Sequence, residues 1–558
     1  MLTALAVTAC GDEKPAAGTP PLAAPPAANI GYKSAVFALA EPAAVADRAT
    51  VVAVEKQAVL NASLITYDTA SSTFAQVNGD INANDDVVVK IEAHLVMDGY
   101  PDDGKAKNAT LRMRGHSTRE SEQKSYRVQL AKDAPAWNGE RALQLNKHPY
   151  DLTHMRNKLA FDLFRDIPHI PSLRTQFVHL TISNKDPRGV PYDAKDYGLY
   201  THVEKLGKDY LAARGLPRSG NIYKAENFEF KLSENLALTA DGDAVNETNF
   251  KKTLSLEANN HNHTRLKEML TALNDPGTDF EVFFAKYFDK SNYLTWLATS
   301  ILFGNRDTIN QNFALYQAAN SDTFYFLPWD YDGAFGFEDQ PDQAPAPLYA
   351  SWQQTLANWW SIPLHQKFMK NPAHLGELKL AVDELYNHFL TEAMIKSRLD
   401  KYKPLVQPYI INPPDATYLP VLGDELQAEW EAECNRIPAT VQKNRQLFLD
   451  GLENPMPFYE IAEPAEDGQL RLGWDESYDL QGDALSYQVQ VAATPDFASP
   501  LVNQTVSNKT ELMIPKPANG TYYLKVTARD SKGHSQISFT KASADEKTWF
   551  GVFKFEIY

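Results

Sequence analysis

The chain has 558 residues, a formal net charge of −17 and an apolar content of 43%. A chain of this length is expected to form about three to four domains, and its apolar content is sufficient for packed cores. The negative charge argues against a nucleic-acid partner and for an acidic surface. No apolar run in the sequence is long enough to cross a bilayer.

The N-terminal segment suggests export. Residues 1–10 end in Val-Thr-Ala-Cys and resemble the lipobox of bacterial lipoproteins, although the usual positively charged start is missing. We therefore predict a lipoprotein signal remnant with a lipid on Cys10, followed by a Pro/Ala-rich tether at residues 11–47. These features predict an exported protein, lipid-anchored to a bacterial cell membrane at the outer membrane or cell surface. The alternative is a disordered tail with an incidental cysteine.

A first domain is predicted over residues 48–452. Within it, residues 109–130 have the pattern of two strands joined by a polar turn, and alternation places Arg112 and Arg114 on one face of the first strand. Lys124 lies in the second strand of this pattern. Arginine binds phosphate as a fork and lysine binds it as a point charge. The hairpin is therefore a candidate phosphate site, and a solvated strand face is an equally good interpretation.

The stretch that organises the chain begins with an apolar helix at residues 293–303. A polar loop with Asp307 and Asn312 follows, then two strands, and then Asp330 and Asp332. Such oxygen ligands suit a hard cation such as Mg²⁺. The order of aspartate, asparagine five residues later and metal-binding aspartate matches that of protein kinases, although no kinase Gly-rich loop is visible upstream. A turn with solvated acids is the alternative.

Six ordered segments carry a family resemblance: RGHSTRESEQKSYRVQL, RNKLAFDLFRDI, YGLYTHVEKLGKDYL, GNIYKA, FGNRDTINQNFALY and FLPWDYDGAFG. Together they resemble the CotH family of spore-coat-type atypical protein kinases. The resemblance implies an atypical protein-kinase-like fold that uses ATP and Mg²⁺ to phosphorylate Ser/Thr in protein partners. It further implies that Asp307 is catalytic and Asp330 binds metal, with Asn312 and Asp332 completing the metal site.

The resemblance also suggests ATP- and phosphate-binding residues. By analogy with the kinase Lys–Glu pair, Lys124 would contact phosphate and Glu204 would orient it, with Lys224 as the rival lysine. Arg112 and Arg114 are the remaining candidates. The sequence departs from the family pattern at His116, where asparagine is usual, and this leaves the role of that turn open. Close acids repel one another, so without metal one carboxyl of the site should have a raised pKa.

The sequence pattern of the C-terminal part predicts helices followed by strands. Apolar positions recur every three or four residues over 353–452, which indicates packing helices that close the first domain; Cys434 within them is predicted to be buried rather than nucleophilic. From residue 457 to 558, short alternating strands predict an all-β sandwich, and Trp474 and Tyr522 resemble a fibronectin type III module. The predicted fold class is therefore α+β, with a kinase-like domain followed by this sandwich.

Two functions from different classes follow. The first is a surface-tethered atypical protein kinase that transfers the γ-phosphate of ATP to Ser/Thr of protein partners. The second is a non-catalytic surface scaffold or adhesin with the same fold, which is favoured by the scarcity of ATP outside the cytoplasm. A glycosidase that uses a carboxylate pair ranks last, because no sugar-stacking context accompanies the acids.

Overall fold

The computed structural model describes residues 58–81, 88–101, 104–115, 117–341, 349–544 and 546–558. The predicted signal remnant, the tether, Cys10 and the departure at His116 lie outside these residues. None of the described helices has the length and apolar character needed to cross a membrane. The described chain combines helices and sheets, and the α+β class is confirmed.

The first part of the chain is a closed β-barrel with the strand order β1-β2-β3-β4-β5-β7-β6. Side chains alternate between the barrel core and the outside, as in β3, where every second residue is buried. Helix α2 (Phe74–Asn78) adds Val77 to this core. The strands are β1 (Leu60–Tyr67), β2 (Ile91–Met97), β3 (Ala109–Arg114), β4 (Ser125–Leu130), β5 (Ala142–Asn146), β6 (Thr175–Lys185) and β7 (Lys195–Glu204).

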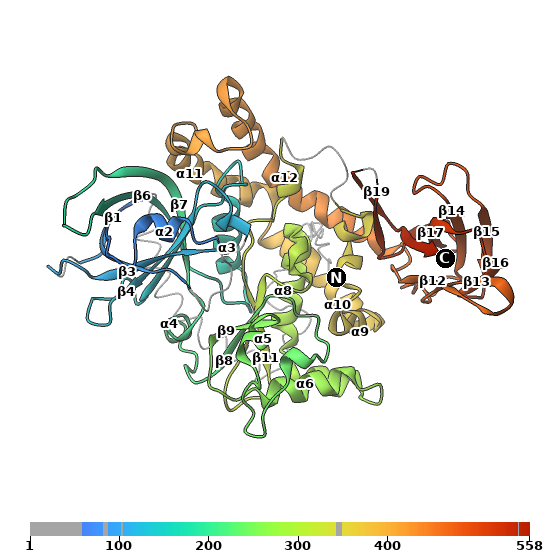
Figure 1. Cartoon of the computed structure of the whole chain (residues 1–558). Helices are drawn as coiled ribbons and strands as arrows, with labels where there is room; N and C mark the ends of the chain where they lie inside the picture. Colours follow the sequence, from blue (N-terminus) through green and yellow to red (C-terminus); the bar gives the residue numbers. More distant parts are fainter. Residues whose placement is uncertain (1–57, 82–87, 102–103, 116, 342–348, 545) are drawn as a thin grey trace, which may run out of the picture.

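A second, antiparallel sheet has the order β11-β10-β8-β9 and lies beside the barrel (Figure 1). Its strands are β8 (Asn221–Ala225), β9 (Leu254–Ala258), β10 (Phe313–Gln317) and β11 (Phe324–Pro328). Helix α8 (Lys290–Phe303) packs against β11 and is buried along nearly its whole length. The other helices of this part of the chain are α3 (Arg156–Asp166), which packs on β6 and β7 of the barrel, α4 (Lys208–Ala213), α5 (Glu247–Lys251), α6 (Thr264–Asn274) and α7 (Phe280–Tyr287).

Helix α8 has clear sequence signals at both ends. The side chain of Asp289 accepts a hydrogen bond from the backbone N–H of Asn292 and so caps the start. Gly304 ends the helix with a φ of 66°, and a Cβ at this position would lie 2.5 Å from Nδ2 of Asn444. Both the left-handed backbone and the close approach require glycine. The predicted helix break therefore fixes where the polar loop with Asp307 starts.

C-terminal helices pack on α8 and on β7 of the barrel, and they form the packing helices that the periodicity predicted. Within this helical region the stretch from Leu356 to Met369 is divided into a 3₁₀ turn (Leu356–Trp359) and a separate helix, α9, because Pro363 starts a new helix. Cys434 is buried in the last helix, as predicted. The helices are α9 (Pro363–Met369), α10 (Pro372–His388), α11 (Glu392–Ile410) and α12 (Leu426–Leu452).

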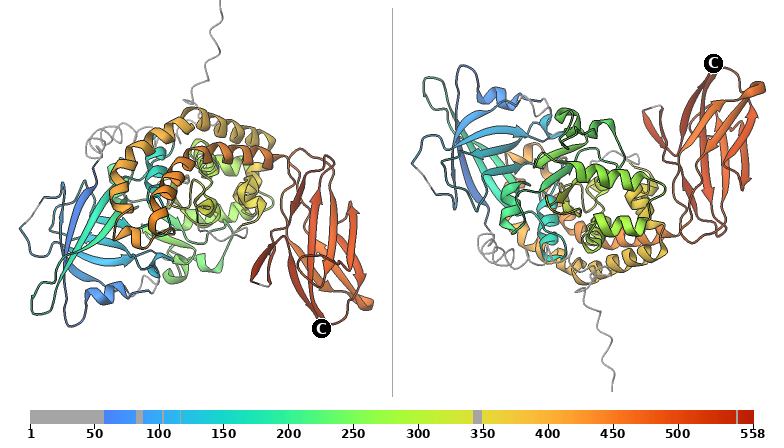
Figure 2. Two further views of the ribbon diagram at one scale, coloured as in Figure 1. Left: turned by 90° about the horizontal axis from the view of Figure 1, so that it is seen from above. Right: turned by 90° about the horizontal axis from the view of Figure 1, so that it is seen from below.

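After α12 the chain forms two antiparallel sheets that share one apolar core. Both views of Figure 2 show these sheets to one side of the helices, joined to the end of α12. Trp474 and Tyr522 both lie in the shared core. The strands are β12 (Glu460–Pro464), β13 (Gln469–Trp474), β14 (Ser486–Ala492), β15 (Val502–Ser507), β16 (Glu511–Pro515), β17 (Gly520–Arg529), β18 (Ser535–Ile537) and β21 (Phe553–Ile557), with the hairpin β19 (Lys541–Ala544) and β20 (Lys547–Phe550) beside them.

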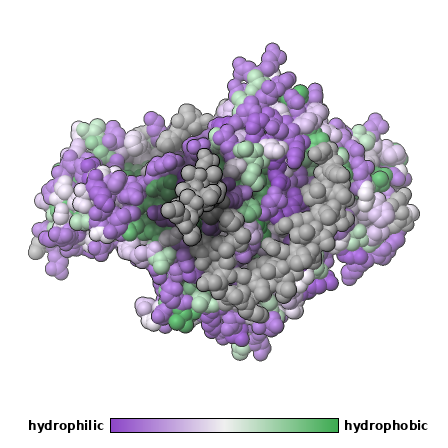
Figure 3. Space-filling model, turned by 180° about the vertical axis from the view of Figure 1, so that it is seen from behind, coloured by the Kyte–Doolittle hydropathy of each residue, from purple (hydrophilic) through white to green (hydrophobic). Residues whose placement is uncertain are grey.

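The surface is predominantly polar on the face seen from behind. Figure 3 shows mostly hydrophilic residues on that face, with small apolar areas between them. This agrees with the excess of acidic residues in the sequence.

Candidate functional site

The loop that follows α8 forms one wall of a pocket of about 180 Å³. A 3₁₀ turn, η4 (Arg306–Ile309), carries Asp307 into this pocket. Asp332 lines the same pocket from the loop after β11, and His148 and Tyr150 line it from the segment after β5. Two of the predicted site residues, Asp307 and Asp332, therefore share one pocket although they come from different loops.

The hairpin β10–β11 brings the other two predicted metal ligands to one end of the sheet. Phe313 pairs with Pro328, so Asn312 and Asp330 lie just beyond the last paired residues of neighbouring strands. Both have a left-handed backbone, with φ of 57° at Asn312 and 52° at Asp330. Such conformations cost about 1–3 kcal/mol each and concentrate at functional sites.

The carboxyl of Asp330 has a strongly perturbed pKa. Burial, together with the nearby charge of Asp332, raises the pKa of Asp330 to about 7, and Arg114, His148 and Lys224 act in the opposite direction. The carboxylate of Asp332 also lies 3.5 Å from Nδ1 of His148. The expectation of one raised carboxyl pKa in this group of acids is met at Asp330.

Asp307 shows a weaker form of the same effect. It keeps contact with solvent at the pocket mouth, although neighbouring protein atoms displace much of its water. Loss of water and the charge of Asp332 raise the pKa of Asp307, while Arg306 opposes the rise. Asp332 thus links Asp307 and Asp330 electrostatically, and we call these three residues the site acids.

The polar outer face of the barrel lies opposite the site acids. In the β3–β4 ladder Arg112 pairs with Arg127 and Arg114 pairs with Ser125, so Arg112, Arg114 and Arg127 project from one face. Burial lowers the pKa of Arg114, and the charges of Asp330, Glu257 and Asp332 oppose this effect. Arg114 also donates a hydrogen bond to Oδ1 of Asn146. The predicted pair of arginines is therefore on one face, and Arg114 lies close to the acids.

Of the two candidate phosphate-binding lysines, Lys224 rather than Lys124 lies near Asp330. Lys224 lies on β8, with its Nζ 2.7 Å from Oε1 of Glu226 and 5.5 Å from the ring centre of Trp329. It contributes to the electrostatic environment of Asp330. Lys224 therefore reaches the end of β11 where the acids lie.

Lys124 has a different environment. Its Nζ donates a hydrogen bond of 2.6 Å to the carbonyl of Arg119, within the β3–β4 turn. It precedes β4, and strand alternation groups it with Tyr126, whose ring lies in the barrel core. Alternation therefore places Lys124 on the opposite face of the hairpin from Arg112 and Arg114.

Glu204 does not form the expected pair with Lys124. It is fully buried at the end of β7, and its two carboxylate oxygens lie 2.7 Å from Arg174 and 2.7 Å from Arg214. These two arginines hold the pKa of Glu204 well below its usual value, to about 2, against the effect of burial. This corrects the expectation that Glu204 orients a phosphate-binding lysine, since both oxygens are already occupied by arginine.

Two residues of the site were missed by the sequence analysis. Asn305 is buried, donates a 3.3 Å hydrogen bond to the carbonyl of Asp330, and its Oδ1 has no hydrogen-bond partner within the described part of the chain. His148 is the other, at 3.5 Å from Asp332. Asn305 directly precedes Arg306-Asp307, so its position next to the motif was an available signal; no spacing pattern marks His148.

Comparison with known proteins supports the resemblance. A family model described as "CotH kinase protein" matches residues 111–448, which is more than half of the chain. The chain belongs to the CotH family. The matched region runs from β3 to α12, so every element of the site lies within the CotH domain, and the two C-terminal sheets lie outside it.

A curated relative of this CotH domain is "Inner spore coat protein H" of Bacillus subtilis (strain 168). It is 28% identical over 224 residues, which covers 40% of this chain and 58% of the relative. The chain thus spans a little over half of the length of the curated relative that it matches.

Proposed function

We propose that this protein is a Mg²⁺-dependent atypical protein kinase that transfers the γ-phosphate of ATP to Ser or Thr of protein partners. One observation carries the proposal: the site acids lie across from cationic residues of two different elements, Arg114 on the barrel and Lys224 on the second sheet. Such a site can bind a metal–phosphate complex, since the acids attract the metal and the cations attract the phosphates.

The residues present fit a Mg²⁺ ion. Oδ1 of Asn305 is a buried carbonyl oxygen without a hydrogen-bond partner in the described residues, and it belongs to the residue that contacts the backbone of Asp330. A buried unpaired oxygen is costly unless a ligand satisfies it. The raised pKa of Asp330 likewise indicates negative charge that lacks full compensation. Asp330, Asn312 and Asp332 would hold the ion, with Asn305 nearby, and the ion would neutralise phosphate oxygens when bound.

The chain's own residues supply the remaining functions. Asp307, which lines the pocket, can accept or orient the proton of an attacking hydroxyl, and the rise in its pKa caused by burial and by Asp332 makes it a stronger base. Arg114 and Lys224 can offset the negative charge that develops during transfer. Catalysis of this kind depends on positioning and charge compensation rather than on covalent chemistry with the protein.

The proposal includes the C-terminal sheets as a fibronectin type III-like module. The hydroxyl of Tyr522 on β17 donates a 3.0 Å hydrogen bond to the carbonyl of Ala518, four residues upstream. This contact is similar to the tyrosine corner of immunoglobulin-like sandwiches, and it supports a spacer or binding module. We further propose export and a lipid anchor on Cys10, which mass spectrometry of the membrane-extracted N-terminal peptide would test.

A second candidate is a non-catalytic surface scaffold. The observation that favours it is the relative's description as a spore coat protein, which names a structural location rather than a reaction. A scaffold would not need the site acids, so their replacement should leave its binding partners unchanged.

The test is a transfer assay with the purified chain, ATP and Mg²⁺, in which phosphate on the protein itself and on casein is measured by mass spectrometry. The critical variant is Asp307→Asn. Its matched control is Asp275→Asn, which changes an aspartate in an exposed turn between α6 and α7. Transfer that persists in D275N and is lost in D307N supports the kinase. The absence of transfer from the unmodified protein, with no change in thermal stability on addition of Mg²⁺ and ATP, contradicts it.

A further inference from the structure

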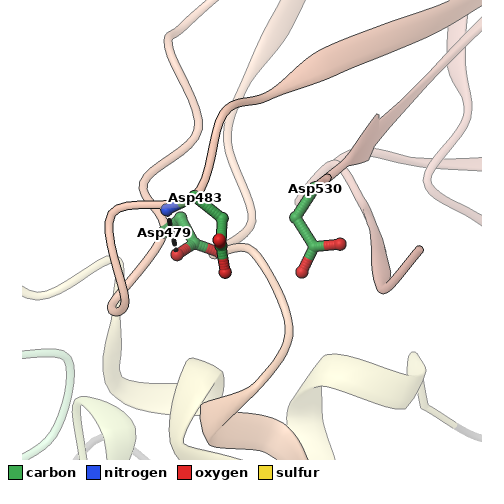
Figure 4. A group of neighbouring side chains, drawn as sticks. All are labelled: Asp479, Asp483 and Asp530. Atoms are coloured by element: carbon green, nitrogen blue, oxygen red, sulfur yellow. Dashed lines mark hydrogen bonds between the residues drawn. The ribbon is translucent and has the colours of Figure 1, made fainter. Parts of the chain in front are cut away.

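Three aspartates come together at one end of the two C-terminal sheets. Asp479 and Asp483 lie in the loop between β13 and β14, and Asp530 follows β17. One carboxylate oxygen of each lies within 4.8 Å of those of the other two. Figure 4 shows the carboxylates of Asp483 and Asp530 facing the same gap, with Asp479 beside Asp483.

Asp479 supplies a second, independent indication of a ligand. The residue is only 7% exposed, and its Oδ2 is buried with no hydrogen-bond partner in the described residues. The other oxygen, Oδ1, accepts the backbone N–H groups of Gln481 and Asp483, both at 2.9 Å. A carboxylate fixed by two backbone donors but left with a buried, unsatisfied oxygen is expensive, unless a cation contacts that oxygen.

Asp530 is held in place in a similar way. It is also 7% exposed, and its Oδ1 accepts three backbone N–H groups, from Lys532, Gly533 and His534. Its Oδ2 lies 2.8 Å from Nδ1 of His534. Within the described residues three of these contacts are to Oδ1 and one is to Oδ2, so Oδ2 retains a lone-pair position while the bonds to Oδ1 fix the orientation of the carboxylate.

The basic side chains that contact these carboxylates, Lys532 and His534, are both accessible to solvent. Lys532 lies 2.8 Å from Oδ2 of Asp483, but the lysine side chain is 53% exposed. An exposed ion pair of this kind contributes little and is easily exchanged. The three carboxylates can therefore exchange this lysine for a more highly charged cation.

We propose that Asp479, Asp483 and Asp530 form a binding site for a hard divalent cation of the Ca²⁺ type. Calcium takes oxygen ligands at about 2.3–2.6 Å in adaptable geometry, so two oxygens on opposite sides of the ion lie about 4.6–5.2 Å apart. Oxygens within 4.8 Å of one another can therefore share one ion. Loop carboxylates of this kind suit Ca²⁺ better than Mg²⁺, which demands near-ideal octahedral geometry.

The site lies where the C-terminal sheets meet the CotH domain. The amide of Gln481, within the same loop, donates a 2.8 Å hydrogen bond to the carbonyl of Leu452 at the end of α12. The neighbouring Tyr478 accepts a 2.8 Å hydrogen bond from the backbone of Met456, and its ring centre lies 5.4 Å from that of Trp360. An ion on Asp479 and Asp483 would stiffen this loop and so fix the orientation of the sheets. The inference does not depend on the proposed kinase activity.

The experiment is calorimetric titration of the full chain with CaCl₂, in an Asp330→Asn background that weakens cation binding at the kinase-like site. We expect one saturable site. Asp479→Asn keeps the shape of the side chain and an Oδ1 oxygen that can still accept the backbone N–H groups. The side chain of Asp483 contacts the side chains of Ser531 and Lys532, so Asp483→Asn breaks no bond to the backbone. Each should weaken Ca²⁺ binding at least about tenfold, because each removes a charged ligand. The matched control is Asp496→Asn, an aspartate in the same module that likewise accepts a backbone N–H, and it should bind normally.

Circular dichroism of each variant checks that the sheets are folded. Lys532→Met gives an independent readout, since removal of the competing ammonium should tighten Ca²⁺ binding without altering the ligands. The site would be overturned if the parent showed no saturable Ca²⁺ binding, or if D479N and D483N bound Ca²⁺ as tightly as the parent does. Equal displacement of Ca²⁺ by equimolar Mg²⁺ would overturn the assignment to calcium.

Discussion

Lys147 and Asp415 form an ion pair in which neither side chain is exposed to solvent. Lys147 directly follows β5 of the barrel, whereas Asp415 lies in the 3₁₀ turn η8 (Asp415–Thr417) between α11 and α12. Asp415 also accepts a 2.7 Å hydrogen bond from the backbone N–H of Leu199. Burial lowers the pKa of Lys147, and Asp415 opposes that change. The pair joins the barrel to the C-terminal helices.

The first prediction concerns this pair. Asp415→Asn leaves the Lys147 ammonium buried without its counter-charge, which should lower the free energy of unfolding by about 3–5 kcal/mol. Urea denaturation at pH 7 measures the change. The control is Asp400→Asn, which breaks the exposed pair with Lys396 and should cost less than about 1 kcal/mol. Equal effects of the two substitutions would show that the buried pair has no special role.

The second prediction is a pH dependence of stability due to Asp330. Its pKa is raised to about 7 in the folded chain, so between pH 4 and 7 the folded chain binds a proton that the unfolded chain has released. Stability due to this group therefore falls as pH rises through that window. Asp330→Asn should stabilise the protein by up to about 4 kcal/mol at pH 8 and by little at pH 4. Thermal unfolding of both proteins from pH 4 to pH 8, without Mg²⁺, measures how the stability difference between them changes with pH. A stability difference that stays constant with pH would contradict the prediction.

The third prediction couples metal binding to proton release. Because Asp330 is mostly protonated at pH 6, binding of Mg²⁺ should release nearly one proton there and almost none at pH 8.5. Calorimetry in two buffers with different ionisation enthalpies measures the number of protons. In Asp332→Asn the main charge repelling the Asp330 carboxylate is gone, so the release at pH 6 should shrink. A release that does not change with pH would exclude Asp330 as the metal-linked group.

The fourth prediction separates the two candidate lysines. Lys224→Met should lower kcat/KM for ATP by about 100-fold or more, because it removes a cation beside Asp330. Lys124→Met should have little effect, because its Nζ donates to the carbonyl of Arg119 within a turn. Steady-state kinetics of both variants decides between them, and the opposite ranking would restore Lys124 as the phosphate ligand.

The fifth prediction concerns Glu204. Glu204→Gln leaves Arg174 and Arg214 without their shared carboxylate, so we expect a loss of about 3–5 kcal/mol in unfolding free energy. The folded fraction should keep its KM for ATP, since Glu204 contacts no residue of the site acids. Glu268→Gln, which breaks an exposed pair with Arg265, is the control for a harmless substitution. A selective rise in KM without loss of stability would instead support the original orienting role.

The sequence alone determined the parts of this protein that depend on local order. Helix α8 has an aspartate cap and a terminal glycine, and a short turn joins strands β10 and β11. These local signals predict that Asp307, Asn312, Asp330 and Asp332 lie in the loops at the ends of these elements. The ordered motifs sufficed to predict the family, and alternation within β3 sufficed to put Arg112 and Arg114 on one face.

Only the tertiary structure decided which charged groups meet. The sequence favours Lys124, with Lys224 as its rival, whereas the β3–β4 register and the position of β8 put Lys224, and not Lys124, among the charges that act on Asp330. Glu204 looked available until folding brought Arg174 and Arg214 to it. His148 reaches Asp332 from a distant segment, and Asn305 reaches the backbone of Asp330, 25 residues further along the chain. Asp479 and Asp530 are far apart in the sequence and approach because the strands beside them, β14 and β17, pair in one sheet, with Ser486 opposite Arg529. The physical reason is the same in each case: periodicity fixes the face on which a side chain lies, whereas its charge partner is set by packing between distant segments.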